Sequence, residues 1–352
     1  MHIIKTALLS YGMSGKIFHA PFIAAHSGFQ LLGSWERSKK KIQEDYPDAI
    51  SYPTLEAVLA DESIELVIIN TPNNTHFDYA TKTLLANKHI VVEKAFTTTV
   101  SEGMSLKALA DKQQKKISVY QNRRYDSDFR TVQNIIEEKL LGEIVEAEFH
   151  YDRFKPVVGP KLHKETAGPG AGLLMDLGPH LIDEALCLFG MPQAVFADIR
   201  VTRLLSKVDD WFDLLLYYPF FRVRLKASGF VKEAIPANII HGCNGSFIKP
   251  RADVQEADLL AGKNPGDINW GIEPESGYGL LHTEKDGVVV KEHILSTKGN
   301  YGDYYEGVYQ ALTTAKPMPV SAQDGINTII IIEGAVKSCA EKRVVELYPP
   351  LK

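Results

Sequence analysis

The first third of the chain alternates short apolar runs with stretches in which apolar residues recur at helical spacing. The apolar runs predict buried parallel strands, because a strand covered on both faces is apolar at nearly every position. These runs cover residues 3–9, 30–35, 66–70, 89–93 and 117–121. The stretches between them predict helices at residues 16–25, 55–60, 75–87 and 101–114, with Pro21 bending or restarting the first. This alternation indicates an α/β fold with a doubly wound parallel sheet and right-handed crossovers.

The pattern changes beyond residue 123. Residues 144–151 alternate as a half-buried strand does, and further strands are predicted at residues 195–203, 211–218 and 223–229. Asn244-Gly245 is a strong hairpin signal, and hairpins join antiparallel strands. We therefore predict a dinucleotide-binding domain over residues 1–122 and a second domain, for substrate binding and oligomerisation, over residues 123–352.

Composition narrows the class of protein. The 352 residues suffice for two domains, and 45% hydrophobic and 24% charged residues are typical of a globular protein. A net charge of −5 gives no reason to expect nucleic acid as a partner. The apolar N-terminal run is too short to span a membrane and lacks a cleavage site of small residues. Cys187, Cys243 and Cys339 show no paired spacing, which favours neither disulfides nor a zinc site and suits the cytoplasm.

Polar side chains follow each of the five predicted strands. The carboxyl ends of parallel strands are where such sheets bind ligands. The polar segments are residues 10–15, Glu36-Arg37-Ser38, Thr71-Pro72-Asn73, Glu93-Lys94 and residues 121–124. Five strand ends with polar chemistry are a stronger indication of a ligand site than the glycine loop alone.

The loop LLSYGMSGK resembles a G-x-G-x-x-G dinucleotide motif in which Ser10 replaces the first glycine. Gly12 retains the position where backbone approaches the pyrophosphate, and Gly15 the position that permits close helix–strand packing. The Ser10 hydroxyl could bond a phosphate or a neighbouring amide. The glycines alone would also fit a plain strand–turn–helix corner. The acidic Glu36, about 20 residues further on, favours nucleotide binding.

Five stretches together are typical of one family. They are LLSYGMSGKIFHAPF, VIINTPNNTHFDYA, VVEKAF, SVYQNRRYDSDF and GLLMDLGPHLIDEALCLFG. In this order they resemble the Gfo/Idh/MocA family of glucose–fructose oxidoreductase, inositol dehydrogenase and their relatives. HGCNGSFIKP, NWG and GNYGDYYEG are similar to the branch that contains NADP-dependent scyllo-inositol dehydrogenase.

The resemblance implies an N-terminal Rossmann domain and a C-terminal α/β domain with a large, mostly antiparallel open sheet. It implies hydride transfer between a nicotinamide cofactor and a ring hydroxyl or ketone of an inositol-like polyol or sugar. The residues expected to bind the cofactor are Ser10, Tyr11, Gly12, Met13, Ser14, Gly15, Glu36, Arg37, Ser38, Thr71, Pro72, Asn73, His76, Glu93, Lys94 and Gln121. Candidates for the substrate pocket, each of which could equally be a packing or surface residue, are Arg124, Tyr151, Arg153, His163, Trp270 and Tyr278.

Lys94, Asp176 and His180 match the family's catalytic residues. Neutral His180 would take the hydroxyl proton as general base, Asp176 would orient the imidazole, and Lys94 would bond the same oxygen. From the residues alone, Asp176 could merely cap a helix entered through Gly178-Pro179. A metal site of His163, His180, Asp183 and Glu184 is the less favoured alternative, because the spacing fits no standard site. We therefore expect no metal.

Two departures from the family pattern affect these expectations. Ser10 stands where the family has glycine, and Ala95 stands where the family has a proline that is often cis. A peptide bond that precedes alanine is almost always trans. We therefore expect a trans Lys94–Ala95 bond, which would change the placement of Lys94.

We expect NADP to be preferred over NAD, although NAD is possible. Glu36 favours NAD, because a carboxylate accepts a bond from the ribose 2′-hydroxyl and repels a 2′-phosphate. Arg37 and Ser38 with the lysines at 39–41 favour the phosphate, and the related inositol enzymes carry a serine–arginine pair there. Glu36 could turn outward or pair with a lysine, and the basic run could simply be a solvated helix turn.

The same fold supports other functions. A non-catalytic sugar- and cofactor-sensing regulator, an NAD-dependent glycosidase and a structural role are the alternatives. The partners we expect are a small polyol or sugar and, as the family implies, a second copy of the chain in a homodimer or homotetramer formed through the C-terminal sheet. No nucleic acid or membrane partner is expected.

Overall fold

The computed structural model of the chain describes residues 2–36, 39–159 and 165–347. The chain forms two compact units. Unit one comprises Met1–Tyr125, Gln255–Trp270 and Asn300–Ile326, and unit two comprises Asp126–Val254, Gly271–Gly299 and Asn327–Lys352. The first change of unit lies close to the expected boundary at residue 122. The chain then returns to unit one twice, which the sequence pattern did not predict.

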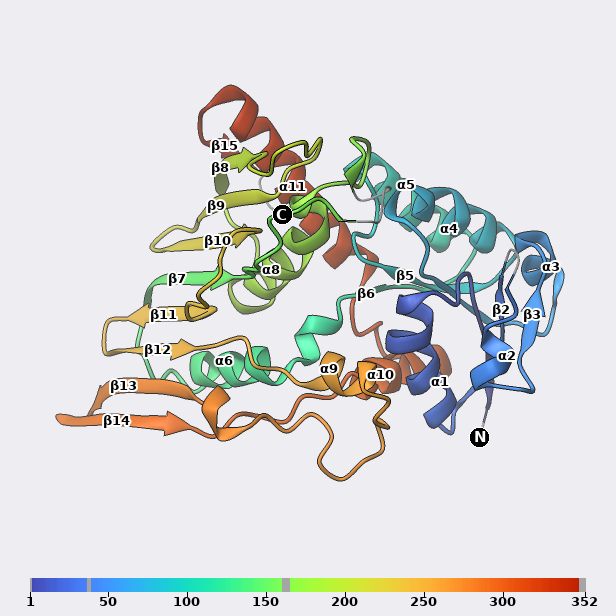
Figure 1. Ribbon diagram of the computed structural model, residues 1–352, viewed down its shortest axis with the longest axis horizontal. Coiled ribbons are helices and arrows are strands. Elements are labelled where there is room, and N and C mark those ends of the chain that lie inside the picture. The colour runs from blue at the N-terminus through green and yellow to red at the C-terminus, as the bar shows by residue number, and fades with distance from the viewer. Residues whose placement is uncertain (1, 37–38, 160–164, 348–352) are drawn as a thin grey trace. The chain divides into compact units, whose positions relative to one another are not determined.

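Unit one is built on a parallel sheet in the order β3-β2-β1-β4-β5-β6 (Figure 1). Its strands are β1 Ile4–Leu8, β2 Phe29–Trp35, β3 Ile50–Tyr52, β4 Leu66–Ile69, β5 His89–Glu93 and β6 Ile117–Tyr120. Every residue of β4 and β6 is buried, as expected for strands covered on both faces. The strand order is that of a dinucleotide-binding fold, with the reversal between β1 and β4. The predicted fold class is confirmed, while the three-residue β3 was too short to predict.

The helical segments of unit one surround this sheet. They are η1 Gly15–His19, α1 Ala20–Ala25, α2 Ile42–Asp45, α3 Leu55–Ala60, η2 Asn73–Thr75, α4 His76–Leu85, α5 Val100–Lys112, η3 Asn122–Tyr125, α9 Gln255–Leu260 and α10 Gly302–Thr313. The two returning segments contribute α9, which packs against η1, and α10, which packs against α1 and η3. Both therefore cover the region that follows the glycine loop.

Pro21 restarts the first helix, as predicted. Gly15–His19 is a π-helical turn, and α1 begins at Ala20 with Pro21 in its first turn. Proline has no amide hydrogen, so it is best tolerated where a helix begins and that hydrogen has no partner. The restart places His19 at the junction of the two segments.

Unit two contains a nine-stranded sheet in the order β14-β13-β12-β11-β7-β10-β9-β8-β15. Its strands are β7 Ile144–His150, β8 Ala194–Arg200, β9 Trp211–Tyr217, β10 Arg222–Ser228, β11 Asn238–Gly242, β12 Gly245–Lys249, β13 Gly279–Lys285, β14 Val288–Ile294 and β15 Val345–Glu346. All neighbouring strands are antiparallel except β7 and β10. The predicted hairpin at Asn244-Gly245 is confirmed as the β11–β12 connection.

The helices of unit two pack on one face of its sheet. They are α6 Ser127–Glu137, α8 Leu173–Phe189, the short η4 Glu275–Gly277 and α11 Ala322–Glu341, whose first residues belong to unit one. Helix α8 packs against β9 and β10, where Phe212, Leu214 and Leu216 alternate with half-exposed residues. Within the described residues, no helix is both long and apolar enough to cross a membrane.

Candidate active site

The glycine loop lies at the carboxyl end of β1, and a side chain from the end of β4 fixes its conformation. Asn70 Nδ2 donates to the carbonyl oxygen of Ser10 over 2.7 Å. The Gly12 amide donates to Ser10 Oγ over 3.2 Å, so the serine hydroxyl bonds a neighbouring amide, one of the two roles expected of it. The loop therefore forms its turn without the first glycine.

Gly12 and Gly15 have different surroundings, and both fit the predicted motif. A Cβ on Gly15 would lie 2.2 Å from the Ser10 carbonyl oxygen and 2.9 Å from Asn70 Nδ2. A Cβ on Gly12 would approach only Ser10 Oγ, at 3.4 Å. Gly15 thus permits close packing inside the chain, while Gly12 leaves space beside the loop. That space is what a pyrophosphate group needs to reach the backbone, so the loop fits a dinucleotide.

The side chain of Tyr11 points into unit one. Tyr11 is buried, and its hydroxyl donates to Asp45 Oδ2 over 2.8 Å. Burial and this carboxylate raise the pKa of Tyr11 well above its usual value. Lys16 also pairs with Asp45, at 2.7 Å. Tyr11 therefore anchors the loop to α2, and Met13 is the exposed side chain of the loop.

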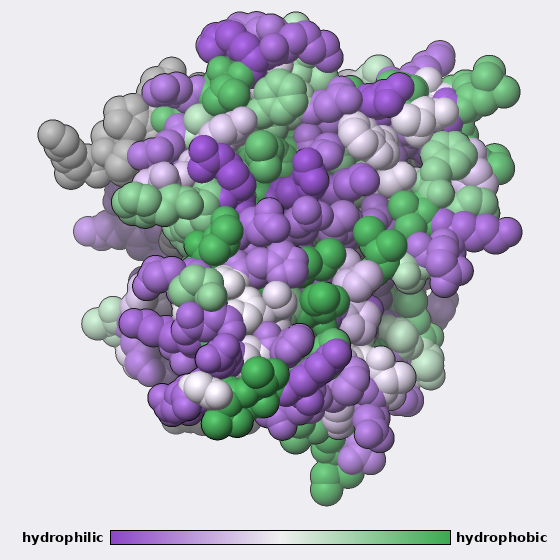
Figure 2. Space-filling model, turned by 90° about the vertical axis from the view of Figure 1, so that its left-hand side faces the viewer, coloured by the Kyte–Doolittle hydropathy of each residue, from purple (hydrophilic) through white to green (hydrophobic). Residues whose placement is uncertain are grey.

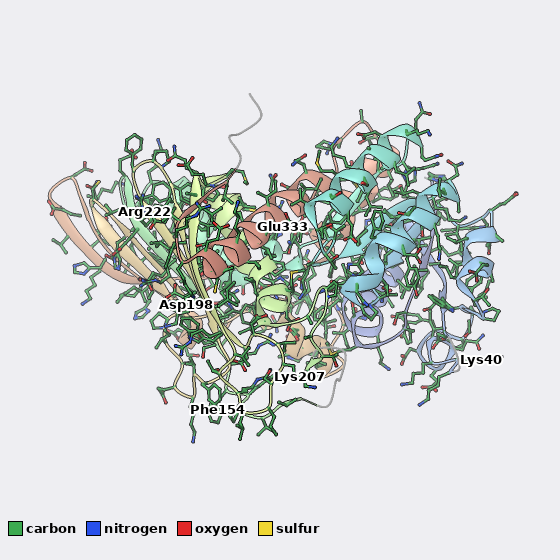
Figure 3. The ribbon with its side chains drawn as sticks, turned by 90° about the horizontal axis from the view of Figure 1, so that it is seen from above. Lys40, Phe154, Asp198, Lys207, Arg222 and Glu333 are labelled. Carbon is green, nitrogen blue, oxygen red and sulfur yellow. The ribbon has the colours of Figure 1, made fainter. Side chains whose placement is uncertain are left out.

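The carboxylate of Glu36, at the end of β2, is bound by its own unit. Oε1 accepts from the Lys41 amide at 2.9 Å, and Oε2 accepts from the Ile42 amide and the Ser51 hydroxyl at 3.2 Å. The structure therefore corrects the expectation that Glu36 turns outward or pairs with a lysine side chain. It binds backbone amides at the start of α2, where a negative charge is favourable. Arg37 and Ser38 lie outside the described residues, and Lys39, Lys40 and Lys41 are exposed. Figure 3 labels Lys40.

The segment after β4 is joined to the segment after β5 through His76. Its Nε2 lies 2.9 Å from the Thr71 carbonyl oxygen, and its Nδ1 lies 2.8 Å from that of Ala95. The ring is fully buried, and burial lowers the pKa of His76 from its usual value. His76 can therefore support a cofactor site through these two backbone segments rather than by direct contact. Thr71, Pro72 and Asn73 lie at the end of β4, where Thr71 and Thr75 exchange a hydrogen bond of 2.6 Å.

The expectation of a trans Lys94–Ala95 bond is wrong, because this bond is cis. The expectation rested on the intrinsic preference of the peptide unit, which surrounding structure can override. Here Ala95 and Phe96 are buried and the Ala95 carbonyl faces His76. Lys94 itself is partly exposed at the end of β5.

Glu93 lies at the centre of a hydrogen-bonded cluster. Its Oε1 accepts from the Ser14 hydroxyl and from His19 Nε2, the latter at 3.1 Å, and its Oε2 accepts from the Lys94 amide at 3.2 Å. Burial alone would raise the pKa of Glu93, but the bonds from His19 and Ser14 outweigh it and lower that pKa to about 2. Glu93 is therefore ionised at every pH near neutrality.

We expect Glu93→Gln to lower the free energy of unfolding at pH 7 by roughly 2–3 kcal/mol. A pKa lowered in the folded state stabilises the fold above the unfolded value of about 4.3 and stops doing so as the pH falls through the folded value. The difference between the parent and the variant should therefore shrink to roughly half or less at pH 3. Urea unfolding at pH 7 and pH 3 measures it, with the exposed Glu284→Gln as control. An equal difference at both pH values would contradict the assignment.

The remaining candidates of unit one lie after β6 or on the returning segments. Gln121 is buried directly after β6, and Arg124 Nη2 lies 3.6 Å from Asp324 Oδ1. Trp270 was left open as a pocket or a packing residue. It is buried, its indole N–H donates to Gln255 over 3.1 Å, and its ring packs edge-on against Phe22. These contacts favour the packing role for Trp270.

Asp176 and His180 lie on α8 in unit two. They are one helical turn apart, a spacing that places two side chains on the same face of a helix. His180 is buried, and Asp176 is partly exposed in the first turn. The interpretation that Asp176 caps a helix entered through Gly178-Pro179 is wrong, because the helix begins at Leu173 and contains both residues. The extensive burial of α8 overrides the usual tendency of proline to end a helix.

Tyr151, directly after β7, lies beside this helix. Its ring centroid is 6.2 Å from that of His180, and the guanidinium groups of Arg251 and Arg153 lie 4.5 Å and 5.0 Å from the same ring. Arg251 is fixed in turn by a bidentate pair with the buried Glu184, at 2.9 Å and 3.1 Å. Arg251 was not predicted, and nothing in its sequence context distinguishes it. The structure therefore brings the candidates Tyr151, Arg153 and His180 together and adds Arg251.

The start of α8 is held by the loop between β8 and β9. The amide of Leu173 donates to the Asp209 carbonyl oxygen at 2.8 Å, and that of Leu174 to Asp209 Oδ2 at 2.6 Å. A Cβ on Gly172 would lie 1.9 Å from Asp209 Oδ1, so only glycine allows this approach. Asp209 therefore caps the helix that carries Asp176 and His180.

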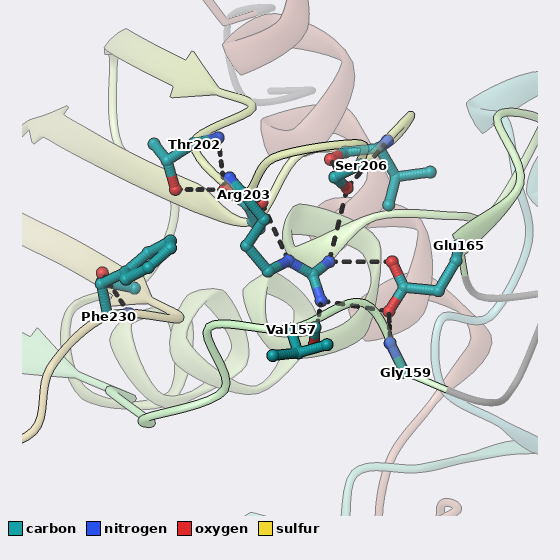
Figure 4. Close-up of polar contacts among 10 residues, drawn as sticks. Val157, Gly159, Glu165, Thr202, Arg203, Ser206 and Phe230 are labelled. Carbon is teal, nitrogen blue, oxygen red and sulfur yellow. Dashed lines mark hydrogen bonds and ion pairs between the residues drawn. The ribbon is translucent and has the colours of Figure 1, made fainter.

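Arg203 joins the same loop to the segment around Glu165 (Figure 4). Its guanidinium pairs with Asp210 at 2.9 Å and binds both carboxylate oxygens of Glu165, at 3.1 Å and 2.9 Å. All three side chains are nearly buried. His163 lies outside the described residues, and Tyr278 is partly exposed directly after η4.

The family comparison matches both parts of the chain. Residues 4–121 match the NAD-binding Rossmann fold of the oxidoreductase family Gfo/Idh/MocA, and residues 133–347 match its C-terminal α/β domain. Together with the strand order and the glycine loop, this defines an oxidoreductase that binds NAD or NADP through its N-terminal half.

Similar proteins cover nearly the whole chain. The scyllo-inositol 2-dehydrogenase (NADP(+)) IolW of Bacillus subtilis is 38% identical over 98% of this chain and 96% of its own length. The uncharacterised oxidoreductase YdgJ of Escherichia coli is 36% identical over 96% and 97%. The solved structure of an oxidoreductase, yvaA, from Bacillus subtilis has a TM-score of 0.95 at 37% identity, covering 99% of both chains. One from Bacteroides fragilis has a TM-score of 0.90 at 44% identity, covering 98% of this chain and 100% of its own. The chain belongs to the Gfo/Idh/MocA oxidoreductase family.

Proposed function

We propose that this oxidoreductase transfers a hydride between NADP and a ring CH–OH group of an inositol-like polyol or sugar. The observation that carries the proposal is the pair Asp176 and His180, one turn apart on α8, in a chain whose β5 ends at Glu93, directly before Lys94. The relative IolW, named as an NADP-dependent scyllo-inositol 2-dehydrogenase, supports the substrate class.

In the proposed reaction His180, Asp176 and Lys94 each have a separate task. Oxidation of an alcohol removes a hydride from carbon and a proton from oxygen, and the nicotinamide supplies the hydride acceptor when it is bound. The protein then has to manage one proton. Neutral His180 accepts it, Asp176 orients and polarises the imidazole, and Lys94 hydrogen-bonds the reacting oxygen.

A screen of inositols and aldoses tests the substrate class. Each compound is mixed with the enzyme and NADP or NAD, and the absorbance of the reduced cofactor is followed; the ketones are tested in reverse. Turnover with a cyclic polyol supports the proposal. Cofactor binding without turnover on any compound would favour the sensing regulator, and release of a sugar without net reduction of the cofactor would favour the glycosidase.

The preference for NADP is supported by the engagement of Glu36. Both of its carboxylate oxygens already accept hydrogen bonds from residues of unit one, so fewer of its acceptor positions are left for a ribose hydroxyl. The exposed lysines 39–41 add positive potential beside the same strand end. The NADP dependence of IolW points the same way.

We expect kcat/KM to be higher with NADP, and Arg37→Ala to remove most of that advantage. The arginine can pair a 2′-phosphate in a bidentate way, which contributes about 1.5–3 kcal/mol, or roughly ten- to a hundredfold. Kinetics with both cofactors measure it, and Lys107→Ala on α5 controls for the loss of a surface charge. A parent enzyme that prefers NAD would contradict the assignment.

We further propose that the chain forms a homodimer or homotetramer through the open face of the nine-stranded sheet. That face is opposite α8 and carries Phe196, Leu215 and Tyr217 beside an ion pair of Arg224 with Asp213 at 3.3 Å. Figure 2 shows hydrophilic residues over most of this side, with hydrophobic ones scattered among them. Asp198 and Arg222 lie on the strands concerned (Figure 3). Light scattering, which measures the molar mass of the parent and of Leu215→Glu, tests this interface. The same mass for both proteins would contradict the proposal.

A further inference from the structure

A buried histidine that no step of the proposed reaction uses lies between the glycine loop and the catalytic lysine. His19, at the junction of η1 and α1, has no exposed surface. Its Nε2 contacts Glu93 Oε1 at 3.1 Å, and its Nδ1 contacts the Tyr305 hydroxyl at 2.6 Å. Together with Ser14, these residues form what we call the Glu93 network. All four belong to unit one.

The chemistry of the partners assigns a hydrogen bond to each ring nitrogen. Glu93 is ionised and can only accept hydrogen bonds, so His19 Nε2 carries the hydrogen of this contact. Burial raises the pKa of Tyr305 well above its usual value, so its hydroxyl keeps its hydrogen. That hydroxyl can donate as well as accept, and it forms the hydrogen bond with Nδ1 in either role. Every polar atom of the ring is then satisfied, as burial requires.

The network holds two parts of the cofactor site at once. Through Oε1, Glu93 binds the hydroxyl of Ser14 in the glycine loop, and through Oε2 it binds the amide of Lys94. A shift of the carboxylate would therefore move both. The Tyr305 end is firmly placed, because its ring stacks on Phe22 at 6.2 Å and lies 6.1 Å from the rings of Phe29 and Tyr120.

We propose that His19 is a positioning residue that holds Glu93, and through it Ser14 and Lys94, while the Tyr305 hydroxyl of α10 fixes the orientation of the imidazole ring. Tyr305 lies on a segment that returns to unit one almost 200 residues after β6. The C-terminal half of the chain thus supplies part of the cofactor site. The effect on cofactor binding rests only on the dinucleotide site, whereas the effect on kcat also rests on the proposed function.

Dinucleotide affinity, measured by calorimetric titration of the intact enzyme, tests the proposal without any substrate. Tyr305→Phe removes only the hydroxyl, and we expect it to weaken binding roughly five- to tenfold. The matched control is Tyr309→Phe, one turn further along α10, whose hydroxyl bonds the His2 carbonyl oxygen at 3.1 Å. It should bind as the parent does. Equal weakening by both variants, or no weakening by Tyr305→Phe, would overturn the proposal.

Two substitutions of His19 separate its contacts. His19→Gln can place an amide donor near the position of Nε2, and His19→Asn can place an acceptor near that of Nδ1 but cannot reach Glu93. We expect the glutamine variant to bind the cofactor about as well as Tyr305→Phe and the asparagine variant to bind it at least tenfold more weakly than the parent. Equal binding by the two variants at equal melting temperature would contradict the role of the Glu93 contact.

A double-mutant cycle tests the path through Ser14. If Tyr305 acts on the cofactor through Glu93 and Ser14, Tyr305→Phe should weaken binding less in a Ser14→Ala background than in the parent. Full additivity of the two changes would overturn this path.

Kinetics add a second readout: His19→Asn should lower kcat while leaving the KM for the polyol nearly unchanged, because only Lys94 among the catalytic residues depends on Glu93. A rise in KM alone would contradict it. If the parent enzyme binds the dinucleotide but oxidises no polyol, the proposed function is refuted. The titrations with the dinucleotide would still test the positioning role of His19.

Discussion

Replacing His180 by alanine is expected to lower kcat about 10²- to 10⁴-fold while leaving the affinity for the dinucleotide unchanged. In the proposed reaction His180 is the general base, which acts in the transition state, so its loss should reduce kcat and kcat/KM together. Lys94→Ala should have the same effect, because in that proposal the lysine bonds the reacting oxygen. Steady-state kinetics on the best substrate and a binding titration of each variant measure the two effects.

The controls for this prediction come from the same units. His282→Ala on β13 and Lys107→Ala on α5 remove exposed side chains of the same types, and both should retain the parental turnover. If Asp176 acts through His180, adding Asp176→Asn to His180→Ala should cost little more than His180→Ala alone. Near-parental turnover of both alanine variants would show that the catalytic assignment is wrong.

The second large effect is expected at Gly12. Gly12→Val should weaken dinucleotide binding by at least about a hundredfold, because the side chain would fill the space in which the pyrophosphate approaches the backbone. The fold should change little, since a Cβ at this position meets only Ser10 Oγ at 3.4 Å. Calorimetry gives the affinity, and thermal unfolding of the apoprotein gives the stability.

Gly15→Ala is the informative contrast, because its Cβ would lie 2.2 Å from the Ser10 carbonyl oxygen. The backbone must shift to accommodate it, which we expect to cost about 1–3 kcal/mol or more of stability. Gly266→Val, at an exposed loop position, should change neither property. Parental affinity in Gly12→Val would show that the cofactor does not bind at this loop.

Several parts of the site were predictable because their physics is local. Buried parallel strands produce continuous apolar runs, and the polar residues after them must gather at one edge of the sheet. Gly12, Gly15, Glu93 and Lys94 were found in this way. Asp176 and His180 became candidates through the family resemblance, because their spacing alone also fitted a helix cap, and the hairpin after β11 was predicted from Asn244-Gly245.

Other features of the site depend on contacts between distant residues, which a local sequence pattern does not reveal. The cis Lys94–Ala95 bond opposes the preference of the isolated peptide. Whether Trp270 is a pocket or a packing residue was left open by the sequence, and its packing against Phe22 and its bond to Gln255 favour the packing role. For Glu36 the sequence left open a side chain that turns outward or pairs with a lysine, and instead it binds the amides of Lys41 and Ile42.

The sequence by itself determined the parallel sheet and the glycine loop, and it supplied the candidates for the catalytic residues. Periodicity and motif spacing report interactions between residues close in the chain, and these features depend on little else. Only the tertiary structure decided that α9 and α10 return to unit one and that Tyr305 meets His19. It also decided that Asp209 caps α8 and that Arg251 lies over Tyr151. These contacts join residues tens to hundreds of positions apart, and they form because packing and the satisfaction of buried polar groups select them when the whole chain folds.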